Sequence, residues 1–330
     1  LHNWPRVTLC TYVTSLMFLL SLGCWGRADE NDSRTKADQP VSVDEVIERL
    51  EQVEAKLHGF RVHCLSTVDR RNSSIRVVEE LEEIFGDVSS SRTTTNVVWH
   101  YRDDGSWRFE ADVVQVDATA DAAKQTKKFS AYSVFDGPRG RGKYLTLNSP
   151  DSDVRVSKEE EQYGSTPKGF LQKRPTEFLT QSWRRSFTDE LRQDQGKITR
   201  REILDGRALV VLTTKARKVR PNIPFYLYRE FWIDVERGVV VRLQTFARES
   251  EDSQWGLQLR QESSGYEWDA GSELWLPTSA KELQWNLSAD GKGKLFSLAV
   301  FAFSGWEINP EFAPETFLLE QSWYTPNDRP

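Results

Sequence analysis

Residues 226–247, YLYREFWIDVERGVVVRLQTFA, contain two runs of aromatic and β-branched residues on either side of a short turn. Such residues are enriched in β-strands because their side chains pack well on a pleated surface. Asp234 and Gly238 bound the turn, and glycine permits the backbone conformation that a tight reversal requires. The stretch therefore predicts two antiparallel strands joined as a hairpin.

The same pattern continues on both sides of this hairpin. Asp-Gly pairs at 104–105 and 205–206 lie between similar runs, which is a strong local signal for a hairpin. Further short runs, punctuated by Gly, Asp or Pro, continue as far as KLFSLAVFAFSGWEI at 294–308. We therefore expect a mainly β (α+β) domain built on an antiparallel sheet or barrel.

Two segments have helical periodicity instead. Ser42 and Glu45 form a capping box ahead of an apolar stripe at Val46, Ile47, Leu50, Val53 and Leu57, and Gly59 ends the segment. This pattern predicts an amphipathic helix that packs on another element. Residues 166–191 interrupt the strands and predict one or two short amphipathic helices inserted in the middle of the chain.

The composition of the 330 residues is that of a soluble folded protein, with a formal net charge of −6 and a pI of about 5.5. The basic run KARKVR at 215–220 contains no aromatic residues, so we expect no nucleic-acid partner. Twelve Trp, nine Tyr and seventeen Phe residues supply enough apolar area for a large core. We expect residues 42–330 to form one domain.

The N-terminus predicts export to the periplasm or cell envelope. Residues 8–25 carry no charge and precede a Gly26-x-Ala28 cleavage signature, which indicates a signal peptide over 1–28, followed by a disordered linker over 29–41. If uncleaved, the apolar segment is just long enough to anchor the chain in a bilayer. The sequence LSLGC at 20–24 also resembles a lipoprotein box, in which Cys24 would be lipidated. These three routes remain open.

Recognisable catalytic patterns are absent from the sequence. His2, His58, His63 and His100 lack metal-ligand spacing, and no nucleophile elbow or phosphate-binding loop follows a strand. We therefore expect no catalytic residue, no metal and no cofactor. The glycine-rich GPRGRG at 137–142 is expected to be a flexible loop, and Cys64 a small buried apolar residue. An enzyme would require carboxylates that converge in the fold.

Several short motifs resemble the periplasmic lipoprotein carriers LolA and LolB and the related RseB-type sensor domains. They are FWID at 231–234 followed by ERGVVVRL at 236–243, YE at 266–267 leading to LWLPT at 274–278, and Ile308-Asn309-Pro310 with Phe312 and Phe317. The resemblance covers about Ser42 to Phe317. It implies a half-open antiparallel β-barrel closed by helices, an apolar cavity for acyl chains, and a role in sorting lipoproteins to the outer membrane.

Alternation along the predicted strands gives ten candidates for lining such a cavity: Trp99, Trp107, Phe109, Phe135, Tyr144, Leu147, Phe231, Ile233, Val241 and Leu243. The leading functional hypothesis is a non-catalytic carrier or sensor that binds a lipid or lipoprotein acyl chain. The alternative is an envelope protein-interaction module with a packed barrel and no ligand. The competing interpretation of each single residue is that it simply packs in a filled core.

Overall fold

The computed structural model describes residues 41–71, 90–117, 125–136, 141–147, 154–157, 175–182, 185–220, 223–286, 291 and 293–317. The predicted signal peptide with Cys24, the predicted linker up to Pro40, and Gly137 to Gly140 of the glycine-rich segment lie outside these residues. No helix in the described ranges is long and apolar enough to cross a membrane.

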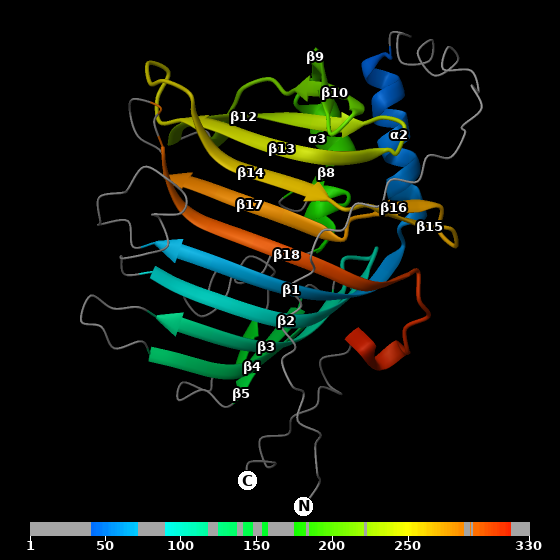
Figure 1. The fold of residues 1–330 in the computed structure, drawn as a ribbon, viewed down its shortest axis with the longest axis vertical. Coiled ribbons are helices and arrows are strands. Elements are labelled where there is room, and N and C mark those ends of the chain that lie inside the picture. Colours follow the sequence, from blue (N-terminus) through cyan, green and yellow to red (C-terminus); the bar gives the residue numbers. More distant parts are fainter. Residues whose placement is uncertain are drawn as a thin grey trace, which may run out of the picture. The chain divides into compact units, whose positions relative to one another are not determined.

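One large antiparallel sheet dominates the fold (Figure 1). In spatial order its strands are β6 (Val154–Ser157), β5 (Arg141–Leu147), β4 (Gln125–Asp136), β3 (Trp107–Asp117), β2 (Ser90–Arg102), β1 (Gly59–Arg71), β18 (Lys294–Ile308), β17 (Ser279–Asn286), β14 (Gly256–Ser264), β13 (Val239–Arg248), β12 (Ile223–Asp234), β10 (Arg207–Thr213) and β9 (Lys197–Leu204). A short strand, β11 (Arg217–Arg220), also pairs with β12. Among the described strands β6 and β9 do not pair with each other, so the sheet is half-open as predicted.

The three predicted hairpins are all present. The turns join β2 to β3, β9 to β10 and β12 to β13. Gly105, Gly206 and Gly238 have φ angles of 83°, 77° and 67°, a backbone region that suits glycine. The local signals in the sequence therefore placed these turns correctly.

One pairing joins the two ends of the described chain. β1 pairs with β18 along most of its length, from Phe60 opposite Ile308 to Arg70 opposite Ser297. On its other side β1 pairs with β2, so strands β1–β6 join strands β9–β14, β17 and β18 in a single sheet through this one contact.

The helices also match the prediction. Helix α2 (Val43–Lys56) begins with the Ser42–Glu45 capping box, in which the Glu45 amide donates to Ser42 Oγ and the Ser42 amide donates to the Glu45 carboxylate. The middle of the chain contributes a 3-10 helix, η3 (Pro175–Phe178), and α3 (Phe187–Gln193). Smaller elements are β7 (Gln181–Ser182), β8 (Arg185–Ser186), β15 (Glu267–Asp269), β16 (Leu274–Leu276) and the 3-10 helix η4 (Pro314–Phe317).

The core lies on the sheet face that packs against α2, α3 and η3, which we call the covered face. One group of buried residues, the aromatic cluster, joins β1–β4 and β18 to η3 and β16. A second group, the helix cluster, joins β10, β12 and β13 to α2 and α3. Fully burying one such aliphatic or aromatic side chain contributes about 1.5–3 kcal/mol, so these clusters dominate the stability of the fold.

Candidate functional site on the covered face

Four of the predicted cavity residues lie together in the aromatic cluster. Trp99 on β2, Trp107 and Phe109 on β3, and Phe135 on β4 are each only 3–5% exposed. The ring centroids of Trp99 and Phe109 are 4.9 Å apart, and Trp107 stacks on Phe109 at 5.8 Å and on Phe135 at 6.0 Å. These separations are those of favourable aromatic pairs.

Strand register explains this grouping. Trp99 lies opposite Phe109, and Trp107 lies opposite Phe135, and residues directly opposite each other in antiparallel strands share a face. Cys64 on β1 belongs to the same cluster and is 2% exposed, as expected from the sequence. Burial raises the pKa of its thiol to about 12, so we expect Cys64 to be unreactive at neutral pH.

Three other candidates lie in the helix cluster. Phe231, Ile233 and Leu243 are 0–2% exposed and pack with residues of α2 and α3. The two clusters are on the same face because Leu243 pairs with Gln261, Gln261 with Glu282, and Glu282 with Ala299 of the aromatic cluster. These seven predicted residues therefore form two groups, which lie on one face but several strands apart.

The remaining candidates are placed differently. Val241 packs beside Leu209, Val211 and Trp232 in a third cluster, away from Leu243. A β-bulge in the β12–β13 pairing causes this, because Trp232 pairs with Arg242 and Ile233 with Val240, which leaves Val241 as the extra residue. Simple alternation would have put Val241 and Leu243 on the same face. Tyr144 and Leu147 pair with Ser133 and Ser130, but their side chains lie outside the description.

A buried polar pair separates the two clusters on the covered face. Gln261 and Glu282 are 4% and 3% exposed, and Gln261 Nε2 donates to Glu282 Oε2 at 2.9 Å. Arg70 on β1 lies near enough for Glu282 to raise its pKa, although burial has the larger effect and lowers that pKa. This pair was not predicted, since in the sequence both residues look like ordinary polar positions of a strand.

A second set of buried polar contacts joins α3 to the sheet and to α2. Glu190 on α3 forms an ion pair with Arg229 on β12, and the two side chains are 1% and 8% exposed. Thr188 at the start of α3 donates from Oγ1 to the Glu54 carboxylate of α2 at 2.6 Å. Burial raises the pKa values of Glu54 and Glu190, and the bonds from Thr188 and Arg229 oppose this. These contacts fix both helices over the helix cluster.

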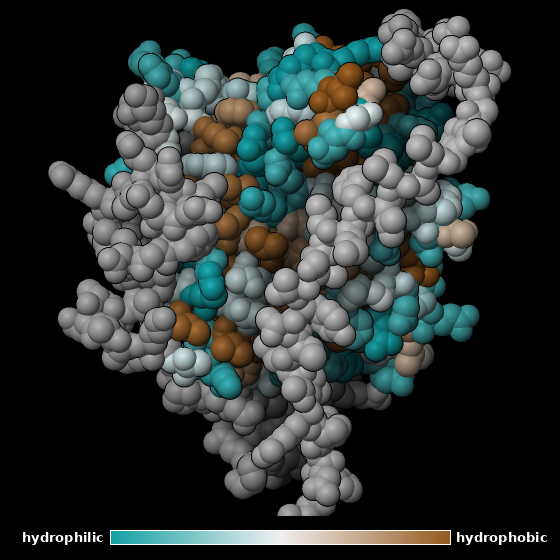
Figure 2. Space-filling model, viewed as in Figure 1, coloured by the Kyte–Doolittle hydropathy of each residue, from teal (hydrophilic) through white to brown (hydrophobic). Residues whose placement is uncertain are grey.

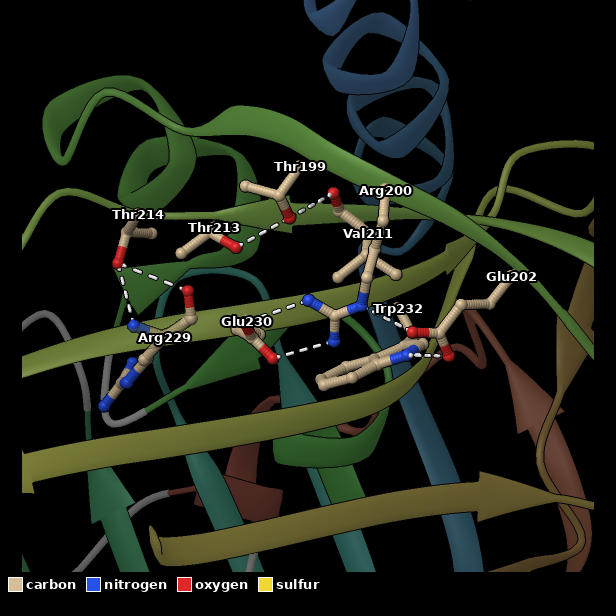
Figure 3. Close-up of polar contacts among 9 residues, drawn as sticks. All are labelled: Thr199, Arg200, Glu202, Val211, Thr213, Thr214, Arg229, Glu230 and Trp232. Atoms are coloured by element: carbon tan, nitrogen blue, oxygen red, sulfur yellow. Dashed lines mark hydrogen bonds and ion pairs between the residues drawn. The ribbon is translucent and has the colours of Figure 1, made fainter. Parts of the chain in front are cut away.

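The opposite face carries a network of ion pairs between β9 and β12 (Figure 3). The Arg200 guanidinium lies over the Trp232 ring at 5.0 Å and donates to the carboxylates of Glu230, at 3.0 and 3.1 Å, and Glu202. Trp232 Nε1 donates to Glu202 at 2.9 Å. Every charge in this group has a partner, so we interpret it as a structural contact that holds β9 in the sheet.

Two further observations bear on chemistry. In the described parts of the chain, no three His, Cys, Asp or Glu side chains gather in a way that could hold a metal ion. On the side drawn in Figure 2, hydrophobic residues of the described chain occur in small groups among hydrophilic ones. The large apolar groups are those of the covered face.

Fold and site together define a class of protein: a half-open antiparallel sheet whose apolar covered face is overlaid by a few short helices. No protein-family model and no curated protein sequence matches this chain.

Three solved structures share a distant likeness. A DUF1329 family protein from Desulfovibrio piger is 14% identical, with 85% of this chain and 99% of that chain covered and a TM-score of 0.45. A β-barrel-like DUF1849 protein from Brucella abortus is 8% identical over 77% of this chain and 99% of that one, with a TM-score of 0.27. MucB, solved in complex with MucA(peri), is 11% identical over 79% and 94%, with a TM-score of 0.22. At these TM-scores the likenesses define neither family nor function.

Proposed function

We propose that this protein is exported to the cell envelope and binds the acyl chains of a lipid or lipoprotein on its covered face, as a carrier or sensor without covalent chemistry. The observation that carries the proposal is the half-open sheet with Trp99, Trp107, Phe109 and Phe135 grouped on that face. Sites for apolar ligands are mostly hydrophobic and aromatic, with a few polar groups that orient the ligand. The buried Gln261 and Glu282 are polar groups of this kind.

The first test is a search for bound lipid. The chain would be expressed at full length, purified without detergent in the form the cell produces, and extracted for mass spectrometry. Fatty-acyl species in stoichiometric amount are the expected result. Protein that is purified without bound lipid and that takes up no fluorescent fatty acid would rule the proposal out.

A pair of variants locates the binding surface. Ala131 on β4 is fully buried in the aromatic cluster, so Ala131→Phe would fill space that an acyl chain needs. The neighbouring Ser130 bonds to Asp112 and belongs to the other face, so Ser130→Phe is a matched control. We expect Ala131→Phe alone to lower fatty-acid uptake, with thermal unfolding recorded for both variants.

An interaction module without a ligand is the second candidate. It is supported by the aromatic rings, which already pack against one another with ring centroids 4.9–6.0 Å apart. A packed core of this kind would leave binding to the surface. Under this alternative the purified protein carries no lipid, and crosslinking in cells joins it to one envelope protein.

A further inference from the structure

A small hairpin outside the main sheet presents an exposed tryptophan. Trp268 on β15 lies opposite Trp275 on β16, with their ring centroids 5.4 Å apart. Trp268 is 50% exposed, whereas most large apolar side chains of the described chain are buried. Figure 1 shows β15 and β16 beside the lower end of α2, and Lys56 of α2 forms an ion pair with Glu273 of this hairpin at 2.8 Å.

The indole pair already holds one cation. Arg237, from the turn between β12 and β13, lies over the Trp275 ring with its guanidinium carbon 4.1 Å from the centroid. This is a cation–π contact, in which the ring face attracts positive charge. Arg237 and Trp268 both pack against the Trp275 ring, and the half-exposed Trp268 ring is free of such a cation in the described chain and could take a second one.

Several contacts hold the hairpin in place. Its buried residues Leu274 and Leu276 belong to the aromatic cluster. Asp269 accepts hydrogen bonds from the amide and hydroxyl of Ser272, which closes the turn. Because Trp268 is positioned before any partner arrives, little conformational entropy is lost when it binds.

The charge of the hairpin favours a basic partner. Residues 265–276 contain Glu267, Asp269 and Glu273 and no Lys or Arg. Asp269 is engaged by Ser272 and Glu273 by Lys56, while Glu267, next to Trp268 in the chain, is exposed and has no ion-pair partner among the described residues. Glu267 and Trp268 are successive strand residues and point to opposite faces, so the carboxylate acts on a partner of the ring through the overall negative charge of the hairpin, which favours a cation over an anion.

We infer that Trp268 is a docking point for a lysine or arginine side chain of a partner polypeptide, which the carboxylates of the hairpin attract at longer range. Rigid, partly exposed tryptophans of this kind are typical energetic centres of protein interfaces. This surface is separate from the ligand proposed for the covered face, so either can fail without the other.

Fluorine NMR of the full chain, labelled with fluorotryptophan and purified as the cell produces it, tests the inference. The probe is a blocked tetra-arginine peptide, and the control peptide carries neutral citrulline at each position. The Trp268 signal, assigned by its loss in Trp268→Phe, should move with tetra-arginine and stay in place with citrulline. Trp268→Ala should weaken binding about two- to five-fold, and Glu267→Gln should weaken it and reduce its salt dependence.

The control variant is Ile203→Ala, which removes another exposed apolar side chain, on β9, and should leave peptide binding unchanged. Equal binding of the citrulline peptide, or unchanged affinity in Trp268→Ala, would overturn the inference. Movement of the Trp268 signal with phosphatidylcholine vesicles but not with the peptide would also overturn it, by identifying a membrane surface instead.

Discussion

The carboxylate of Glu190 and the guanidinium of Arg229 meet between α3 and β12, and both side chains are almost fully buried. Removing one member of such a pair leaves an uncompensated charge in the interior. We expect Glu190→Ala to lower the free energy of unfolding by about 3–5 kcal/mol, measured by urea denaturation. The double variant Glu190→Met with Arg229→Met should recover most of that loss. If it is no more stable than Glu190→Ala, the buried charge is not the cause.

Two turn glycines provide a matched pair of substitutions. Gly238 and Gly206 both have positive φ, but a Cβ on Gly238 would lie 2.9 Å from Val53 Cγ2 of α2, whereas one on Gly206 would meet nothing within 4 Å. Gly206→Ala should therefore cost only the backbone strain, about 1 kcal/mol. Gly238→Ala should cost clearly more, because α2 must move. Equal thermal shifts in the two variants would show that α2 does not rest on the β12–β13 turn.

The lowered pKa of His100 predicts that the stability of the folded protein depends on pH. Burial, with Arg108 and Arg61 nearby, lowers its pKa from 6.5 to about 4, and Glu110 partly opposes this. The unfolded chain therefore takes up a proton at this residue before the folded chain does, so stability falls as the pH drops from about 6.5 towards 4. His100 is partly exposed, and we expect a loss of about 1–2 kcal/mol after solvent screening.

The variant His100→Leu should flatten this part of the stability profile, as measured by urea unfolding at a series of pH values. His63→Leu is the comparison variant: His63 is exposed on the neighbouring strand and makes only the last-named contribution to the lowered pKa of His100, so it should change the slope much less. An unchanged slope in His100→Leu would assign the pH dependence to other groups.

Cys64 reports on the integrity of the aromatic cluster. It is 2% exposed and its thiol pKa is raised to about 12, so we expect the peptide that contains Cys64 to stay unlabelled by a thiol reagent in the folded protein at mildly alkaline pH, as read by mass spectrometry. Denaturant should make it react fully. Fast labelling under native conditions would mean that the cluster opens readily, which would weaken the case for a stable apolar site.

The parts of the fold that depend on local signals could be predicted from the sequence. The Ser42–Glu45 capping box placed α2, and the Asp-Gly turns placed two of the hairpins. Each signal lies within a few residues of the structure it determines, so one chain is enough to read it.

Long-range relationships could not be predicted in this way. The position of Val241 depends on a bulge that is visible only in the pairing of β12 with β13. The contact between Gln261 and Glu282 depends on which strands become neighbours, and β14 pairs with β17 rather than with the next strand in the chain. For the same reason the division of the described cavity candidates among three clusters could not be predicted.

The pairing of β1 with β18 has a consequence for biogenesis. Phe60 can pair with Ile308 only after Ile308 has been synthesised. The sheet therefore cannot be completed until almost all of the described chain has left the ribosome. Closing so long a loop carries a large entropic cost and slows folding. Until then β1 keeps one edge unpaired, and an unpaired strand edge is vulnerable to aggregation in the cell.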